Sequence, residues 1–428
     1  MVFLPFLIMV VALLIGIPIA FALAGSGILG IYIVTGNWNT VVGVLGMVPF
    51  TTVADYSFTT IPMFILMAYF SASSGLATDL FKAGANWLAH IRGGLGAATV
   101  FACGLFGAMS GASTASASVM STIAYPEMRR HGYSEELSAG TVGIGATLDL
   151  LIPPSIPMVI YGIATQTSIA KLLIAGIVPG IIAGIFLLLI VFVWVRVRPQ
   201  DAPQTYRVTW DEKWRSVTRI WPSLLLIAII MVLLYTGIVT ATEVAAVGTF
   251  MAALIGVVLG RLKWTGAFQA LKMTLKTSAM IFTILIGANI FGSYMAMSRV
   301  PQQIVSVVAG MELNRWVVVI GIAVAYFVIS MFMDEIPLLL LTLQLTFPLI
   351  VRLGFDPIWF GVLSIMLVCM GLVFPPVGVV AFVVSATAKV DLMKVFTGTS
   401  IMMIALVLTT VLIMIFPQLV LWLPATMR

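Results

Sequence analysis

Runs of about twenty apolar residues follow one another through almost the whole chain, from residues 3–24 to residues 395–424. A helix of that length crosses the hydrocarbon core of a bilayer. Only 8% of the 428 residues are charged and 61% are hydrophobic, whereas a water-soluble domain uses about a quarter charged residues. The sequence therefore predicts an all-α polytopic membrane protein and leaves no length for a soluble domain of useful size.

The apolar runs fall into two kinds. Ten are expected to be spanning helices: 3–24, 26–50, 58–74, 135–166, 170–195, 220–238, 240–260, 277–297, 357–388 and 395–424. Two more, 94–125 and 315–351, are interrupted at the middle by polar residues, which predicts re-entrant helical hairpins that enter and leave by the same face. Segments 76–91 and 261–276 mix Lys with Trp, Phe and Leu, as amphipathic helices on a membrane surface do. A solvated loop is the alternative for each.

The distribution of Lys and Arg predicts the orientation. With both hairpins re-entrant, sixteen of the 21 cations fall on one side, among them Arg196, Arg198, Arg207, Lys213, Arg215 and Arg219. Cytoplasmic loops carry this excess, so we expect the sixteen on the cytoplasmic side of the membrane and both termini on the outer side. The other side holds Lys171, Arg299, Arg315, Arg352 and Arg428. The net charge of +6 then needs no nucleic-acid partner to explain it.

An internal repeat divides the chain. The polar segment 199–219 is expected to be a cytoplasmic linker between a first repeat, 1–198, and a second repeat, 220–428. A shift of 222 residues (348 − 126) aligns 126–176 with the second half without a gap and pairs Pro153-Pro154 with Pro375-Pro376. Nine identities in 51 positions are weak evidence by number alone. Their positions are more informative, because they include the residues just after each hairpin and the proline pairs inside the apolar runs 135–166 and 357–388. The copies have opposite orientations in the membrane, and inverted repeats are a mark of secondary transporters.

The proline pairs and the hairpin tips predict an ion site. Proline removes backbone donors and pushes the preceding residue out of the α region, so we expect broken helices with unpaired carbonyls at 135–166 and 357–388. The first tip, Ser110 to Ser116, offers hydroxyls, and hard cations take oxygen ligands. Helix N-termini meeting at the tips favour an anion. One site can thus hold a small cation beside a carboxylate.

The same residues are also compatible with purely structural roles. Runs of Ser, Ala and Gly permit close helix packing, and a lone intramembrane proline usually marks a kink. Asp149, Asp334 and Glu335 are costly at membrane depth unless paired, protonated or bound to an ion. Cys103 and Cys369 lie in apolar surroundings and are interpreted as packing residues.

Four motifs together resemble one family: Ala124-Tyr125-Pro126-Glu127-Met128, Ile152-Pro153-Pro154-Ser155, Gly354-Phe355-Asp356-Pro357 and Pro375-Pro376-Val377-Gly378. They resemble the large membrane (M) subunit of tripartite ATP-independent periplasmic (TRAP) transporters of the dicarboxylate and sialic-acid type. The resemblance implies a sodium-driven elevator importer of a small organic acid, with no enzymatic activity. It also implies two partners: a small four-helix membrane (Q) subunit and a periplasmic substrate-binding (P) protein. The membrane is then expected to be the bacterial inner membrane, with both termini in the periplasm.

The resemblance implies two Na⁺ sites and a cargo site between them. The first Na⁺ site would use Ser110, Gly111, Ser113, Asp149, Ile152 and Pro154, and the second Met333, Asp334, Gly371, Phe374 and Pro376. Cargo would lie near Thr114 and Ser155, with Thr165 or Thr387 as further candidates. Arg299, Arg315 and Arg352 are expected to contact the periplasmic protein. The aligned positions Asp149 and Gly371 differ, so the two cation sites need not be equivalent.

Three other functions compete with that of a TRAP permease. A self-sufficient divalent-anion/sodium symporter shares the elevator logic and would work without partners. An intramembrane enzyme would need a nucleophile or metal motif, and Gly-x-Gly-Asp, His-Glu-x-x-His and Gly-x-Ser-x-Gly do not occur in the sequence. A channel is disfavoured because paired helix breaks suit an occluded site.

Overall fold

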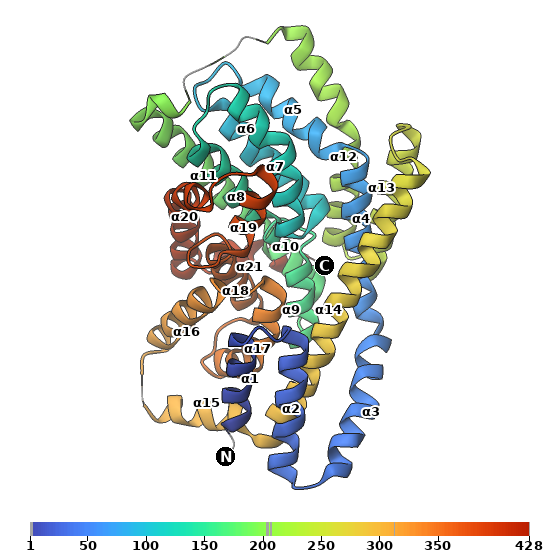
Figure 1. Cartoon of the computed structure of the whole chain (residues 1–428), viewed down its shortest axis with the longest axis vertical. Helices are drawn as coiled ribbons and strands as arrows, with labels where there is room; N and C mark the ends of the chain where they lie inside the picture. Colours follow the sequence, from blue (N-terminus) through green and yellow to red (C-terminus); the bar gives the residue numbers. More distant parts are fainter. Residues whose placement is uncertain (1–2, 203–204, 206–207, 312, 428) are drawn as a thin grey trace.

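The computed structural model describes residues 3–202, 205, 208–311 and 313–427, and the regular structure in that part of the chain is helical (Figure 1). Arg207 and Arg428, which belong to the predicted charge pattern, lie outside the described residues.

The helices of the first half precede the polar linker. They are α1 (Leu4–Leu14), α2 (Ile19–Thr35), α3 (Trp38–Ala54), α4 (Thr60–Ser73), α5 (Leu76–Leu88), α6 (Gly94–Ser110), α7 (Ser113–Arg130), α8 (Glu135–Thr147), α9 (Ile156–Thr165), α10 (Ile169–Ala175) and α11 (Ile177–Val197). Short 3₁₀ turns lie at Tyr56–Thr59, Leu148–Leu150 and Pro199–Asp201.

The helices of the second half follow the linker. They are α12 (Trp210–Thr236), α13 (Ala241–Val258), α14 (Trp264–Ser298), α15 (Val300–Gly310), α16 (Arg315–Ser330), α17 (Glu335–Arg352), α18 (Pro357–Gly371), α19 (Val379–Ala388), α20 (Leu392–Ile415) and α21 (Gln418–Ala425). Both α12 and α13 begin with a capping box, Thr209 with Glu212 and Thr240 with Glu243, which satisfies backbone donors at the first turn.

The molecule is a multi-pass membrane protein. Among the described residues, six helices are long and apolar enough to cross a bilayer, or seven if α3 and the 3₁₀ turn with α4, bent by 53°, form one span. Apolar side chains also cover the outside: Phe250 is 65% exposed and Leu275 70% exposed. An exposed apolar surface of this kind is stable against lipid rather than water.

The N-terminal helices differ from the expected spans 3–24 and 26–50. Gly16, with φ +90°, and Pro18 separate α1 from α2, and Gly36, with φ +63°, ends α2. Three shorter helices therefore replace two long ones, because glycine takes the left-handed backbone that stops a helix. A second difference concerns 261–276, which was expected to be a separate helix on the membrane surface. From Trp264 onward this segment and the expected span 277–297 form one continuous helix, the 35-residue α14. The expected amphipathic segment 76–91 does form a separate helix, α5.

Both predicted hairpins and both predicted broken helices are present. Helices α6 and α7 form the first hairpin and α16 and α17 the second, while α8 with α9 and α18 with α19 are the broken pairs. Helices α7 and α17 begin 222 residues apart and also end 222 residues apart (335 − 113 and 352 − 130). The offset found in the sequence thus recurs in the helix bounds.

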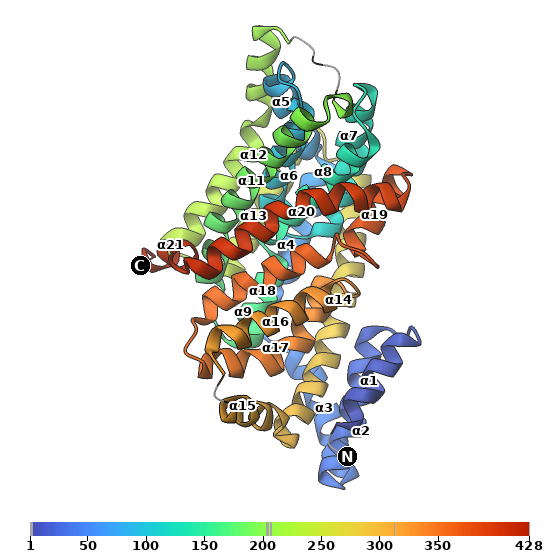
Figure 2. The same ribbon diagram turned by 90° about the vertical axis from the view of Figure 1, so that its left-hand side faces the viewer.

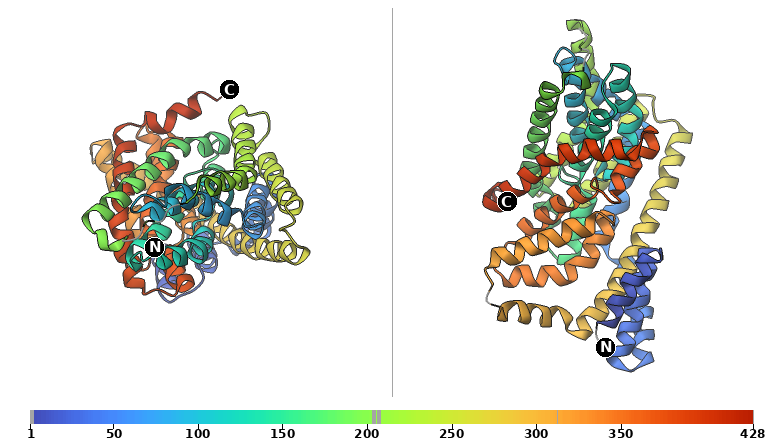
Figure 3. Two further views of the ribbon diagram at one scale, coloured as in Figure 1. Left: turned by 90° about the horizontal axis from the view of Figure 1, so that it is seen from above. Right: turned by 60° about the vertical axis from the view of Figure 1, so that its left-hand side comes forward.

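The helices form two groups. We name α6–α11 with α16–α20 the core group and α2–α4 with α12–α14 the scaffold group. Seen from above, α12, α13 and α14 stand along one side of the core group (Figure 3). In the core group α16 and α17 pack on α18, which packs on α20 (Figure 2). Helices α8 and α20 approach so closely that a Cβ on Gly140 would lie 2.7 Å from Gly398 Cα.

Contacts join the loops that were predicted to share the cytoplasmic side. Lys394 Nζ lies 2.8 Å from Glu135 Oε2, which joins the first turns of α20 and α8 beside those loops. Arg261, after α13, pairs with Asp79 on α5. Ser134 N donates to Asp201 O at 2.9 Å, which fixes the first part of the linker against the end of the first hairpin. The basic loops therefore gather at one end of the molecule.

Candidate functional site

The first hairpin tip is bonded to the first helix break. Gly111 ends α6 with φ +66°, and a Cβ there would lie 2.5 Å from Pro154 O. Its carbonyl accepts a hydrogen bond of 3.2 Å from Ile156 N, at the start of α9. Only glycine permits this backbone conformation together with so close an approach.

Asp149 lies behind this tip and is fully buried. Ser116 Oγ donates to its Oδ2, and its Oδ1 has no hydrogen-bond partner among the described residues. Gly107 makes room for the residue, since a Cβ there would lie 2.8 Å from Asp149 Cα. A buried carboxylate with an open oxygen is costly unless a cation or a proton offsets its charge.

The second tip repeats the arrangement of the first. Gly378 N, in the second break, donates to Met331 O at 3.0 Å, and Phe374 N donates to Gly371 O at 3.1 Å. A Cβ on Gly371 would lie 2.7 Å from the Ser330 carbonyl carbon, so α18 touches the end of α16. Asp334 occupies the N-cap position of α17 without a side-chain capping hydrogen bond, and its Oδ1 is buried without a partner among the described residues.

The two tips meet each other. Ser113 Oγ lies 3.4 Å from both carboxylate oxygens of Glu335. Ser113 is the first residue of α7 and Glu335 the first of α17, and they are 222 positions apart. Cys369 Sγ lies 3.4 Å from Thr147 O, again 222 positions away. Equivalent residues touch each other only near a two-fold axis, so the pseudo-symmetry axis of the two halves passes through the tips.

A cavity of about 370 Å³, which we name the tip cavity, opens between the tips and the scaffold group. From the tips it is lined by Ser110, Ala112, Thr114, Asp334, Glu335 and Ile336, and from α4 and α14 by residues that include Tyr69, Met273 and Thr277. Tyr69 and Thr277 share a hydroxyl hydrogen bond of 3.2 Å. Among the described residues, no basic side chain lines this cavity.

The predicted site residues divide between the tip cavity and other places. Ser110, Thr114 and Asp334 line it, and Gly111, Ser113 and Asp149 stand directly behind. Ser155 is buried and caps α9 by accepting from Met158 N at 3.4 Å. Ile152 packs beside Gly180; in the second half, Met333 is half-buried and Pro376 exposed.

The two threonines proposed as further cargo ligands lie outside the tip cavity. Thr165 lines a second cavity of about 560 Å³, between α3, α14 and α17. Thr387 lies on α19 and lines neither of these two cavities. Each threonine lies at the far end of the helix that starts after its proline pair, α9 for Thr165 and α19 for Thr387. The two residues are equivalent in the repeat, but they lie away from the tips.

Three residues of the site are absent from the ligands that the sequence predicts. Ser116 was recognised as part of the first tip but not as a ligand, and it bonds Asp149 from one turn after Ser113. Glu335 was recognised as an acid at the second tip that a cation could neutralise, but it was not named as a ligand. Tyr69 comes from the scaffold group, and no local pattern in an apolar span indicates it.

The second cavity is bordered by one contact between the two groups and one within the scaffold group. Gln344 Nε2, on α17, donates to Ala288 O on α14 at 2.9 Å. Beside it, Asn289 Nδ2 donates to Thr52 Oγ1 at 2.9 Å. A Cβ on Gly292 would lie 3.0 Å from Gln344 Nε2, so α14 fits closely around this amide. The hairpin is therefore fastened to the scaffold group at this point.

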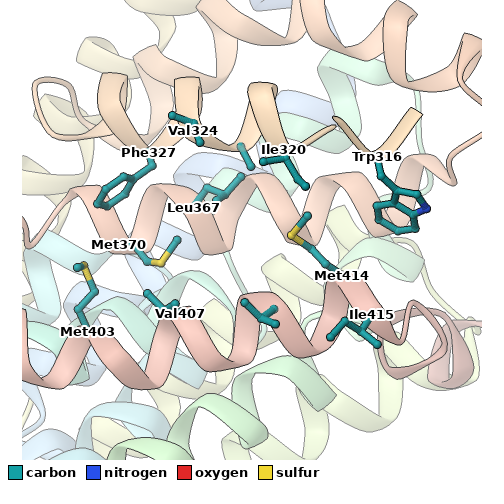
Figure 4. A pocket seen from close by; sticks show the side chains of 12 residues that line it. Trp316, Ile320, Val324, Phe327, Leu367, Met370, Met403, Val407, Met414 and Ile415 are labelled. Atoms are coloured by element: carbon teal, nitrogen blue, oxygen red, sulfur yellow. The ribbon is translucent and has the colours of Figure 1, made fainter. Parts of the chain in front are cut away.

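Two further hollows are apolar. One, of about 670 Å³, lies between α16, α18 and α20, with Trp316, Phe327, Met370 and Met403 around it (Figure 4). The other, of about 690 Å³, lies between α6, α11 and α12 and occupies the corresponding place in the first half. Neither offers charged partners, so neither suits an organic acid.

Comparison with known proteins identifies the family. The family described as "Tripartite ATP-independent periplasmic transporter, DctM component" matches residues 6–419. The chain belongs to this family. The C4-dicarboxylate TRAP transporter large permease protein DctM of Pseudomonas aeruginosa is 35% identical over 344 residues, covering 80% of each chain. The ectoine TRAP transporter large permease protein TeaC of Halomonas elongata is 32% identical over 417 residues, covering 97% of each chain.

A solved structure shares the fold of this TRAP large permease. The crystal structure of the YdaH transporter of Alcanivorax borkumensis has a TM-score of 0.64 and 14% identity, covering 90% of this chain and 89% of that chain. At this identity the likeness concerns architecture alone. The permease is thus a membrane transporter component and not an enzyme.

Proposed function

We propose that this TRAP large permease is a sodium-coupled importer of a small organic acid. Two Na⁺ ions bind behind the tips, one at Ser110, Ser113 and Asp149 and one at Met333 and Asp334, with backbone carbonyls of the two breaks. The cargo binds between them in the tip cavity.

The observation that carries this proposal is the charge of the tip cavity. Asp334 and Glu335 line it, Asp149 lies behind it, and no basic side chain among the described residues lines it. An organic anion placed there alone would be repelled, because like charges in a site of low dielectric raise the energy steeply. Cations that bind to the open oxygens of Asp149 and Asp334 reduce this repulsion. Cargo and sodium therefore bind together.

We further propose an elevator movement of the core group past the scaffold group. The tip cavity is bounded by Ala72 and Met273, close to the ends of α4 and α14 that carry the basic loops. On the opposite side, Gln344 closes the hairpin against α14. These features fit a state that faces the cytoplasm. The chain is expected to contain two inverted repeats, 1–198 and 220–428. If each repeat takes the conformation that the other has in this structure, the site opens to the outer side instead.

The partners follow from the family. The chain is the DctM component of a tripartite system, and we propose a small four-helix membrane subunit and a periplasmic binding protein as the other two. The bilayer is the bacterial inner membrane, with both termini in the periplasm. Arg299, Arg315 and Arg352 lie at the ends of α14, α16 and α17 and are proposed to contact the binding protein.

Reconstitution tests this function. Proteoliposomes that contain the permease and its small subunit, with the binding protein outside, should take up cargo only with an inward Na⁺ gradient. Uptake that is equal in K⁺ would contradict sodium coupling. Robust uptake by the large subunit alone would favour a self-sufficient symporter.

The same acid-lined cavity favours a second class of cargo. A zwitterion such as ectoine, for which the Halomonas relative is named, carries its own positive charge and would meet Glu335 directly. A C4-dicarboxylate, for which the Pseudomonas relative is named, would depend more steeply on Na⁺. Uptake of succinate and of ectoine, each measured against Na⁺ concentration, separates the two.

A further inference from the structure

A third polar cavity, of about 690 Å³, lies between α5, α7 and α12. Figure 1 shows α5 and the start of α12 at the end of the molecule that carries the polar linker. We name this cavity the cytoplasmic vestibule. Its charged lining includes Lys82 on α5, Arg130 on α7 and Arg219 on α12. We propose that the vestibule is an anion site on the release path, where Lys82 and Arg219 attract the carboxylate that leaves the tip cavity; this rests on the proposed function.

The two cations are available because the acids nearby are already engaged. Asp79 pairs with Arg261, and Glu127 lies 3.4 Å from Arg130 and 3.7 Å from His131. The Glu212 carboxylate accepts hydrogen bonds from the backbone and hydroxyl of Thr209. Among the described residues, neither Lys82 nor Arg219 has an ion-pair partner. Both are exposed to the cavity, from two different helices.

One face of α7 joins the tip cavity to the vestibule. Thr114 and Ser118 line the tip cavity, and Thr122 lines the vestibule. Residues four apart lie on the same face of a helix, one turn above the other. The three side chains therefore form a row of polar groups from one cavity to the next, and in this structure the Thr122 hydroxyl donates to Val119 O within α7 at 2.7 Å. Val119 and Ile123 follow the same course beside them.

The gradient of charge along this row gives the path a direction. The tip cavity is acidic, and the vestibule presents the unpaired ammonium and guanidinium groups of Lys82 and Arg219. Once sodium has left the tips, an organic anion is repelled at Glu335 and attracted toward α5 and α12. The vestibule thus favours release into the cytoplasm over rebinding at the tips.

Thiol labelling tests the site without cargo or sodium. Thr122→Cys is introduced into the otherwise native chain, whose Cys103 and Cys369 are buried and supply the background rate. Inside-out vesicles are labelled with an anionic sulfonatoethyl methanethiosulfonate or a cationic trimethylammonioethyl methanethiosulfonate, and each rate is divided by that of a free thiol. The normalised ratio should favour the anion, and Lys82→Gln with Arg219→Gln should lower it about threefold, as expected for two partly screened charges.

Matched controls separate a local site from general surface charge. Lys272→Gln with Lys276→Gln on α14 removes the same net charge outside the vestibule lining and should leave the ratio unchanged. Ser118→Cys, one turn deeper, should also react from the cytoplasmic side, more slowly. No preference for the anion at Thr122→Cys, an equal effect of the α14 variant, or reaction of Ser118→Cys from the periplasmic side alone would overturn the proposal. These rates do not depend on sodium-coupled uptake, so failure here differs from failure of the proposed function.

Discussion

Asp149 is fully buried, and among the described residues Ser116 Oγ donates to its Oδ2 while its Oδ1 has no hydrogen-bond partner. Asp149→Asn keeps the shape and removes the charge. Loss of one charged contact is worth about 1.5–3 kcal/mol, and about 1.4 kcal/mol is tenfold in an equilibrium constant. We therefore expect the Na⁺ concentration for half-maximal uptake to rise at least about tenfold, measured in the reconstituted complex.

Ser121→Ala provides the matched control for this site. Ser121 is buried on α7 like Ser116, yet its hydroxyl has no hydrogen-bond partner among the described residues. Its removal should leave the Na⁺ dependence of uptake unchanged. The cation-site assignment is wrong if Asp149→Asn and Ser121→Ala show the same Na⁺ curve as the native chain.

Gly111 combines a left-handed backbone with contact to Pro154 O. Gly111→Ala adds a strain of about 1–2 kcal/mol for the left-handed conformation and a clash that must push the tip from the break. We expect a lower midpoint of thermal unfolding in detergent and loss of uptake. Gly184→Ala on α11, where a Cβ meets open space, should raise the midpoint slightly, because alanine favours a helix interior by about 0.5–1 kcal/mol. Equal midpoints for both variants would contradict the tip geometry.

The tip residues were predictable because their chemistry is local. Hydroxyls, glycines and proline pairs inside apolar runs are visible without a fold, and the offset of 222 joined them across the halves. Tyr69 and Thr277 were not predictable, because the apolar context of a spanning helix does not say which face meets the tips. Thr165 and Thr387 show the limit of spacing arguments, since each lies beyond the helix that restarts after its break.

At the scale of elements, the hairpins and broken helices were predictable and the N-terminal helices were not. Proline pairs and polar tips mark a break whatever surrounds them. Residues 15–18 and 36–37 connect helices in a region where apolar residues continue on both sides. A prediction from hydropathy therefore gave two long spans where Gly16 and Gly36 separate three shorter helices. The amphipathic segment 261–276 merged into α14 because no proline interrupts residues 264–298 and the three glycines there, Gly266, Gly287 and Gly292, do not have positive φ.

The contact between α8 and α20 makes a prediction about pH. Lys394 Nζ lies 2.8 Å from Glu135 Oε2 at the first turns of the two helices. A glutamate ordinarily titrates at about pH 4.3 and a lysine at about pH 10.4, so both charges of the pair are present from pH 6 to pH 8. The contribution of the pair to stability is therefore constant near neutral pH.

Lys394→Gln consequently should shift the midpoint of thermal unfolding by a small amount that is the same at pH 6, 7 and 8. The shift is small because both side chains are partly exposed and water screens the pair. A shift that changes across this pH range would show that another titrating group shares the contact.

For the whole molecule, an elevator movement requires that contacts between the two groups break in each cycle while contacts within a group persist. The Gln344 contact with α14 belongs to the first kind. The hydroxyl pair of Thr60 and Thr242, 2.8 Å apart between α4 and α13, belongs to the second. The first contact joins the core group to the scaffold group, and the second lies within the scaffold group. The pair can therefore be used to compare movement between the groups with movement inside one group.

Cross-linking therefore distinguishes rigid-body sliding from local gating. Gln344→Cys with Gly292→Cys, bridged by a short reducible bis-methanethiosulfonate, should arrest uptake, and a reductant should restore it. Thr60→Cys with Thr242→Cys, bridged in the same way, should leave uptake intact, because both residues lie in the scaffold group. Arrest by both bridges would indicate that the scaffold group itself deforms. Continued uptake with 344 and 292 fully bridged would mean that the second hairpin does not move past α14, and cargo would then have to reach the cytoplasm by opening of the tips alone.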